Sequence, residues 1–208
     1  MAMKSNFEQD YNKEVLLGRY LDTLYPKLLP DFTIERIKDI NKQHQGIDII
    51  IRKDEDEFLI DEKAQLDYLN KSLPTFAFEI SYVKNNSEVL GWLYDERKLT
   101  HKYFVITGIF LNDVHDITKG FSKCSVTSVD RVKLKDWLVT KGLTFGKIMQ
   151  INNTIRQCVE EDRIPIPELD PVSEGKFYYS KSNKAEQPIN LVLRLENLIR
   201  VGVAKKVS

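Results

Sequence analysis

The stretch GIDIIIRKDEDEFLIDEKAQ, residues 46–65, places ionisable residues at the ends of two apolar runs. Asp48 begins the first run, and Asp61 and Lys63 end the second. Two carboxylates a few ångströms apart repel each other unless a cation lies between them. A hard ion such as Mg²⁺ binds through one or two carboxylates, several waters and a substrate phosphate. Lys63 could then position the attacking water or stabilise charge on the phosphate, so the pattern indicates metal-assisted phosphoryl chemistry.

This chemistry requires the three side chains to meet. Side chains alternate between the two faces of an extended strand, so Asp61 and Lys63 share one face and Glu62 lies on the other. If the two runs pair around a reversal near residues 54–56, residue 48 lies opposite roughly residue 62, which brings Asp48 beside Asp61 and Lys63. The plain alternative is that each strand has simply reached solvent.

The surrounding elements fit such a hairpin. Apolar residues recur at helical spacing from Tyr11 to Leu24, and Pro26 is expected to end this helix. Residues 32–40, 47–51 and 58–64 are expected to form a three-strand antiparallel meander. Further strands are predicted at residues 75–83, 102–110 and 177–182, and helices near residues 132–140 and 144–158. Residues 189–207 are expected to form a strand or a helix whose boundary the sequence does not define.

These residues resemble the signature of the PD-(D/E)XK nuclease superfamily, which has the restriction-endonuclease-like fold. In that family a helix precedes a meander, an aspartate lies on one strand and an acidic-x-Lys triplet lies on the next. Asp48 matches the aspartate, and residues 61–63 match the triplet. Ile47 stands where the motif has proline, a departure that is common among divergent members. The resemblance covers roughly residues 7–110.

The resemblance implies an α/β fold with a restriction-endonuclease-like core, in which a helix and a three-strand meander are followed by further strands in a mixed sheet flanked by helices. It also implies Mg²⁺ or Mn²⁺ bound by Asp48, Asp61 and the backbone carbonyl of Glu62, with Lys63 acting on water or phosphate. The implied function is metal-dependent hydrolysis of phosphodiester bonds, with DNA as the favoured partner.

Four other residues are candidates for supporting roles. Gln65 matches a glutamine often found just beyond the motif lysine, and Glu14 is the best match to an acidic residue on the family's first helix. Glu79 ends an apolar run and could be a further carboxylate of the site or a solvent-facing strand end. Trp92 lies in a connection, where its ring could stack on a base or fill the edge of the core.

Composition limits the class of protein. Of the 208 residues 42% are hydrophobic, which is enough for a core, and 31 basic and 31 acidic residues give no net charge, so overall charge does not indicate nucleic acid. No apolar run could span a membrane and the N-terminus does not resemble a secretory signal, so a cytoplasmic protein without a membrane partner is expected. Cys124 and Cys158 lie far apart and fit buried thiols better than a disulfide or a zinc site.

We expect a single domain over residues 1–208, with a nuclease-like core at about 7–110 and a C-terminal elaboration at about 111–208. A homodimer is left open. The three histidines lack the spacing of a zinc hydrolase, and no nucleophile elbow, Walker loop or dinucleotide motif is present. Two alternatives to a nuclease remain: a catalytically silent nucleic-acid- or protein-binding module on the same fold, and a structural protein whose charged strand ends are incidental.

Overall fold

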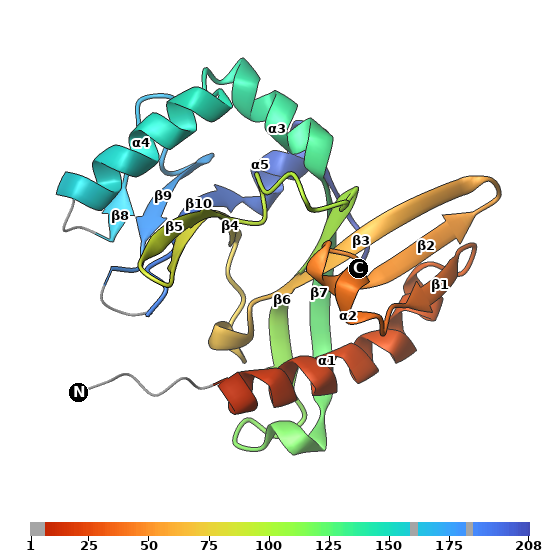
Figure 1. The fold of residues 1–208 in the computed structure, drawn as a ribbon. Helices are drawn as coiled ribbons and strands as arrows, with labels where there is room; N and C mark the ends of the chain where they lie inside the picture. The colour runs from red at the N-terminus through yellow and green to blue at the C-terminus, as the bar shows by residue number, and fades with distance from the viewer. Residues whose placement is uncertain (1–6, 159–161, 182–184) are drawn as a thin grey trace. The chain divides into compact units, whose positions relative to one another are not determined.

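The computed structural model describes residues 7–158, 162–181 and 185–208, and the chain divides into two compact units (Figure 1). Unit 1 comprises Met1–Leu73, Leu99–Val129 and Lys205–Ser208, whereas unit 2 comprises Pro74–Lys98 and Asp130–Ala204. The chain therefore alternates between the units. The expectation of one domain with a core at about 7–110 does not foresee this interleaving, because periodicity records local elements and not which of them pack together.

The described residues of unit 1 form a mixed sheet with the strand order β1-β2-β3-β6-β7-β11. β1, β2 and β3 form an antiparallel meander, and β6 runs parallel to β3. The predicted helix and meander are therefore present, and the mixed α/β class is confirmed. The elements of this unit are α1 (Phe7–Leu28), β1 (Thr33–Arg36), α2 (Ile40–His44), β2 (Ile49–Lys53), β3 (Asp56–Ala64), η1 (Leu66–Tyr68), β6 (Lys102–Leu111), η2 (Ile117–Lys119), β7 (Phe121–Asp130) and β11 (Ala204–Lys206).

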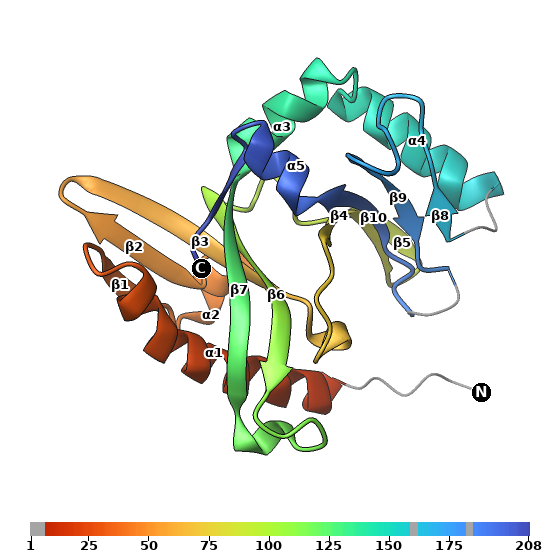
Figure 2. The ribbon, with the colours of Figure 1, turned by 180° about the vertical axis from the view of Figure 1, so that it is seen from behind.

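The described residues of unit 2 form a second sheet of antiparallel strand pairs, with the order β5-β4-β10-β9-β8. Figures 1 and 2 show α3 and α4 along one face of this sheet. The strand predicted at residues 75–83 and both predicted helices are confirmed. The elements are β4 (Thr75–Lys84), β5 (Ser87–Leu90), α3 (Arg131–Thr140), α4 (Phe145–Cys158), β8 (Arg163–Ile164), β9 (Gly175–Tyr179), β10 (Ile189–Arg194) and α5 (Leu195–Arg200).

The first helix extends beyond its predicted end. α1 continues past Pro26 to Leu28. A proline in the last turn removes one backbone hydrogen bond, whereas the Leu29 N–H still donates to the Tyr25 carbonyl over 2.8 Å. The prediction that Pro26 ends the helix is therefore wrong by less than one turn.

Two strands also differ from the sequence-based prediction. The strand expected at residues 32–40 ends at Arg36, because the Asp39 side chain accepts a hydrogen bond from the Asn41 N–H over 2.8 Å and caps the short helix α2. β7 was not predicted, since Ser, Thr and Lys residues occupy half of its length and its buried positions do not alternate regularly.

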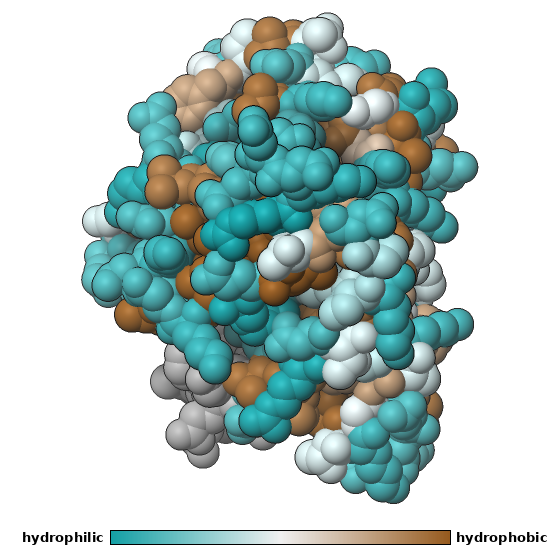
Figure 3. Space-filling model, turned by 90° about the vertical axis from the view of Figure 1, so that its right-hand side faces the viewer, coloured by the Kyte–Doolittle hydropathy of each residue, from teal (hydrophilic) through white to brown (hydrophobic). Residues whose placement is uncertain are grey.

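Hydrophilic residues predominate on the molecular face shown in Figure 3, where hydrophobic residues form small separate patches. Exposed large apolar side chains are spread over several elements and loops, for example Ile40 on α2, Val114 in a loop and Val132 on α3. Isolated apolar residues of this kind are normal on a protein surface. No helix in the described ranges is long and apolar enough to cross a membrane.

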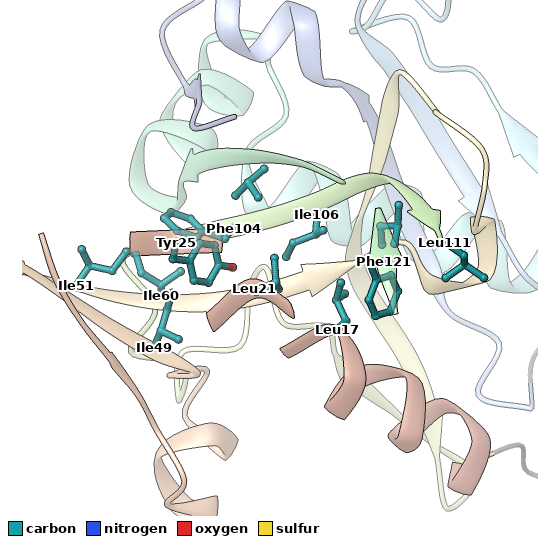
Figure 4. Close-up of a cluster of buried hydrophobic side chains, with 12 residues drawn as sticks. Leu17, Leu21, Tyr25, Ile49, Ile51, Ile60, Phe104, Ile106, Leu111 and Phe121 are labelled. Atoms are coloured by element: carbon teal, nitrogen blue, oxygen red, sulfur yellow. The ribbon is translucent and has the colours of Figure 1, made fainter. Parts of the chain in front are cut away.

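The core of unit 1 determines which face of β3 is covered. Three residues at intervals of four form one buried stripe along α1: Leu17, Leu21 and Tyr25. Figure 4 shows this stripe beside side chains of the sheet, among them Ile49, Ile60, Phe104 and Ile106. Burying each such side chain stabilises the fold by about 1.5–3 kcal/mol. Because strand residues alternate, Glu62 shares the α1 face with Ile60, whereas Asp61 and Lys63 lie on the opposite face.

Candidate active site

The hairpin of β2 and β3 brings Asp48 to Asp61. The ladder pairs Ile49 with Ile60, and the Asp48 N–H donates to the Ile60 carbonyl over 2.8 Å. Asp48 therefore lies at the end of the ladder, immediately before the paired residues and next to Asp61.

This register differs by one residue from the expected one. Lys53 pairs with Asp56, so the turn consists of Asp54 and Glu55, and Asp54 adopts a positive φ of 52°. Continuing this ladder places residue 48 across from residue 61 and not residue 62. The two-residue turn is shorter than the reversal that the charged run suggested, and turn length sets the register of a hairpin.

The Asp48 carboxylate is half-buried and contacts the backbone of β3. Its Oδ2 accepts a hydrogen bond from the Glu62 N–H over 2.7 Å. Burial and, next, the charge of Asp61 raise the pKa of Asp48 from its usual 3.8 to about 7, although Lys63 and the Glu62 N–H act in the opposite direction. The two carboxylates are thus close enough to repel each other.

Asp61 is almost fully buried, with 1% of its surface exposed. Lys63 Nζ lies 2.5 Å from Asp61 Oδ1, and 28% of the lysine side chain remains exposed. Asp61 Oδ2 is also buried, yet it accepts no hydrogen bond from any residue that the structure describes. A buried acceptor without a partner costs about 1–3 kcal/mol, and more when it is charged, so this oxygen lies in a position suited to a ligand.

No family model, curated protein or solved structure matches this chain. The chemistry must therefore be inferred from the geometry of Asp48, Asp61 and Lys63.

These residues fit a divalent cation. Two carboxylates converge, one of their oxygens is buried without a hydrogen bond, and the mutual repulsion of the carboxylates would be relieved by a positive charge. Within the described ranges no group of three or more His, Cys, Asp or Glu side chains could hold a metal. Mg²⁺ does not need such a group, since it keeps several waters and takes one or two carboxylates.

Glu62 occupies the other face of β3, as the alternation predicts. Tyr25 Oη donates to Glu62 Oε1 over 2.5 Å, and Arg36 Nη1 donates to Glu62 Oε2 over 2.5 Å. Arg36 also donates to Asp22 Oδ1 from its Nε over 2.5 Å. Burial and then the Glu62 charge raise the pKa of Tyr25 well above its usual 10. The Glu62 side chain therefore links β3 to Tyr25 of α1 and Arg36 of β1, and only the backbone of Glu62 faces Asp48.

Tyr25 and Arg36 were missed by the sequence analysis as partners of this segment. Tyr25 lies four residues after Leu21 in the α1 stripe, which marks it as buried but does not indicate that its hydroxyl meets a carboxylate. Arg36 ends β1, and only the pairing of β1 with β2 places it near α1.

Gln65 and Glu14 are placed differently. Gln65 follows β3, is partly buried, and donates from its N–H to the Ile106 carbonyl over 3.0 Å. Glu14 is exposed, one turn before Leu17 and in line with the stripe that faces Glu62. The described hydrogen bonds and ion pairs of Asp48 and Asp61 do not include Glu14. The structure therefore brings Asp48, Asp61 and Lys63 together, and the role of Glu14 stays a prediction.

Glu79 and Trp92 belong to unit 2, whereas Asp48, Asp61 and Lys63 belong to unit 1. The Trp92 ring packs on Phe78, with 5.6 Å between ring centroids and 51° between ring planes. A Cβ atom added to Gly91 would lie 2.4 Å from the Glu79 carbonyl oxygen, so glycine is needed where these backbones approach. Trp92 is thus packed at the edge of the unit 2 core.

The free energy of unfolding of the metal-free protein is expected to fall as pH rises from about 4 to about 7. Asp48 has a pKa of about 7 in the folded state against a usual 3.8, so between these values the folded state binds more protons and loses stability with rising pH. Replacing Asp48 with Asn should remove this dependence. The variant should therefore gain on the order of 2–4 kcal/mol over wild type between pH 4 and pH 8.

Urea unfolding in chelator at several pH values measures this difference. Asp113→Asn is a suitable control, because the Lys119 hydrogen bond lowers the pKa of Asp113. Replacing the Asp113 carboxylate should therefore give no gain in the free energy of unfolding at high pH. Parallel pH profiles for wild type and Asp48→Asn would show that the two carboxylates do not interact as described.

Proposed function

We propose that this protein is a metal-dependent nuclease that hydrolyses phosphodiester bonds, with DNA as the favoured substrate. The observation that carries the proposal is the convergence of Asp48 and Asp61 beside Lys63, with Asp61 Oδ2 buried and accepting no hydrogen bond from the described residues. A structural protein gains nothing from two repelling carboxylates at this point, because burying them costs free energy.

Each residue has a distinct role in the proposed chemistry. Asp48 and Asp61 would hold Mg²⁺ or Mn²⁺ together with the Glu62 carbonyl. When bound, the cation supplies a Lewis acid for the phosphate and lowers the pKa of a coordinated water. Lys63, which is partly exposed, orients the attacking water or donates to a non-bridging phosphate oxygen. Hydrolysis joins the water oxygen to phosphorus and breaks the bond to the leaving sugar oxygen, which takes up a proton.

The fold supports the same proposal. A helix precedes an antiparallel meander, Asp48 and the triplet lie on adjacent strands of a hairpin, and the next strand of the sheet runs parallel to β3. This order agrees with the restriction-endonuclease-like core that the sequence resemblance implied.

Cleavage and binding should depend differently on the cation. Ca²⁺ prefers bonds of about 2.3–2.6 Å and irregular coordination, whereas Mg²⁺ requires about 2.0–2.1 Å and near-octahedral geometry. Ca²⁺ should screen the repulsion among Asp48, Asp61 and phosphate without fixing water in line. We expect Mg²⁺ or Mn²⁺ to support both binding and cleavage, and Ca²⁺ to support binding alone.

Gel-shift and cleavage assays on supercoiled, linear and single-stranded DNA measure both properties side by side. Cleavage that persists in chelator would exclude the metal mechanism. DNA binding that is independent of cations and unchanged in Asp61→Ala, without cleavage under any condition, would instead identify a silent binding module.

A further inference from the structure

The sheet of unit 2 has two chemically different faces. Ser81 and Glu88 both bond to Asn152 of α4, over 2.6 and 2.5 Å, so these strand residues mark the face covered by that helix. The strand ladders place a set of buried apolar side chains on the same face: Phe76, Phe78, Phe177, Leu191 and Leu193. This face is the core of unit 2.

The ladders also define the opposite face. Directly paired residues point to the same side of a sheet, and positions two residues apart on a strand do so as well. We call this side the Lys176 face. It carries Thr75, Ala77 and Glu79 from β4, Asn190, Val192 and Arg194 from β10, Lys176 and Tyr178 from β9, and Arg163 from β8.

The Lys176 face is positively charged. It carries the cations Arg163, Lys176 and Arg194 and a single described carboxylate, Glu79. None of these three cations forms an ion pair within the part of the chain that the structure describes. On the helix side of the unit, by contrast, Arg156 pairs with Glu88 over 3.0 Å and Lys141 pairs with Glu174 over 2.5 Å. The charge of Arg194 helps to lower the pKa of Asp170, so this cation acts in part on a carboxyl group of the protein itself. The positive charge of Arg163 and Lys176 is left for a partner.

The arrangement of the other side chains suits a nucleic-acid strand. Tyr178 lies between Arg163 and Asn190 in one cross-strand row, and all three are at least partly exposed. The next row holds Lys176 beside the small residues Val192 and Ala77, which leave a flat centre. An aromatic ring on a sheet surface can stack on an unpaired base, amides read base edges, and cations contact phosphates.

We propose that the Lys176 face binds single-stranded nucleic acid, with Tyr178 stacking on a base and the three cations contacting phosphates. That the bound nucleic acid is the substrate of an enzyme rests on the proposed nuclease function, whereas the binding itself does not. Duplex is disfavoured, because its paired bases cannot unstack onto a tyrosine.

Fluorescence anisotropy of the 208-residue protein in Ca²⁺ tests the proposal. The probes are labelled oligonucleotides of about 12 residues, within the range of known single-strand site sizes, as DNA, as RNA and as DNA duplex. Lys176→Glu should raise the Kd for single strands about tenfold or more and make its salt dependence shallower. Tyr178→Ala should raise the Kd about 5- to 100-fold, and Tyr178→Phe should bind nearly as wild type, because a phenyl ring also stacks.

Lys133→Glu is the matched control, since Lys133 is an exposed cation of α3. Its replacement by Glu changes the net charge by the same amount as Lys176→Glu. Equal weakening by Lys133→Glu and Lys176→Glu would overturn the proposal, as would tighter binding of duplex or no effect of Tyr178→Ala in a variant with an unchanged melting temperature. If Lys176→Glu selectively weakens single-strand binding and the wild-type protein cleaves nothing in Mg²⁺, the binding face is supported and the nuclease function is rejected.

Discussion

Replacing Asp61 with Asn is expected to lower the rate of DNA cleavage by about 1,000-fold or more while leaving the fold intact. The substitution keeps the shape of the side chain but removes the charge that the proposed cation needs. It also relieves the repulsion with Asp48, so the melting temperature without metal should stay the same or rise. Cleavage of supercoiled DNA in Mg²⁺, with the melting temperature measured in chelator, tests both parts.

Lys63→Met should lower the rate of DNA cleavage by about 100- to 1,000-fold, the usual effect of removing one group that stabilises charge in a transition state. It should do so without abolishing metal binding, because both carboxylates remain. Calorimetry with Mn²⁺ separates the two variants: Asp61→Asn loses the metal, whereas Lys63→Met retains it.

A second lysine–aspartate pair provides the control. Lys119 Nζ lies 2.6 Å from Asp113 Oδ2 in unit 1, but both side chains are more exposed than Asp61 and no second carboxylate raises the pKa of Asp113. Asp113→Asn should cleave like wild type. Full activity in Asp61→Asn, or equal losses in all three variants, would show that the Asp48–Asp61 site is not the catalytic centre.

The faces of β3 could be predicted from sequence because strand alternation depends only on local geometry. Alternation alone places Glu62 on one face and Asp61 and Lys63 on the other, and the hydrogen bonds of Glu62 to Tyr25 and Arg36 agree with it. The register was predicted less well. The charged run 52–57 fits turns of several lengths, and each added turn residue shifts the pairing of Asp48.

Other features depend on contacts that no local pattern records. The two units are each built from separate stretches of chain. β6 lies next to β3 in the sheet of unit 1, although β4 and β5, which come between them in the sequence, belong to the sheet of unit 2. Glu14 illustrates the same limit. Helical spacing places Glu14 in line with Leu17 on α1, but the packing of α1 on the sheet decides which side chains lie near Glu14.

Arg36→Met is expected to lower the free energy of unfolding by about 2–4 kcal/mol, at the lower end of the usual cost of breaking a buried ion pair. Arg36 and Glu62 are only 26% and 12% exposed, so removal of the guanidinium leaves a carboxylate with little access to water. Tyr25→Phe removes one hydrogen bond to the same carboxylate and should cost about 1.5–3 kcal/mol. Urea unfolding at pH 7 measures both variants.

Arg52→Met distinguishes burial from simple loss of charge. Arg52 lies on the neighbouring strand β2 and also bonds to two carboxylates, Glu35 and Glu57, over 2.8 and 2.7 Å, but all three side chains are exposed and little stability should be lost. Because Glu62 faces α1, Glu62→Ala should likewise destabilise the protein yet retain most cleavage where it is still folded. Loss of cleavage in a stably folded Glu62→Ala variant would instead mean that this carboxylate acts in the reaction, and that β3 presents its faces in the opposite sense.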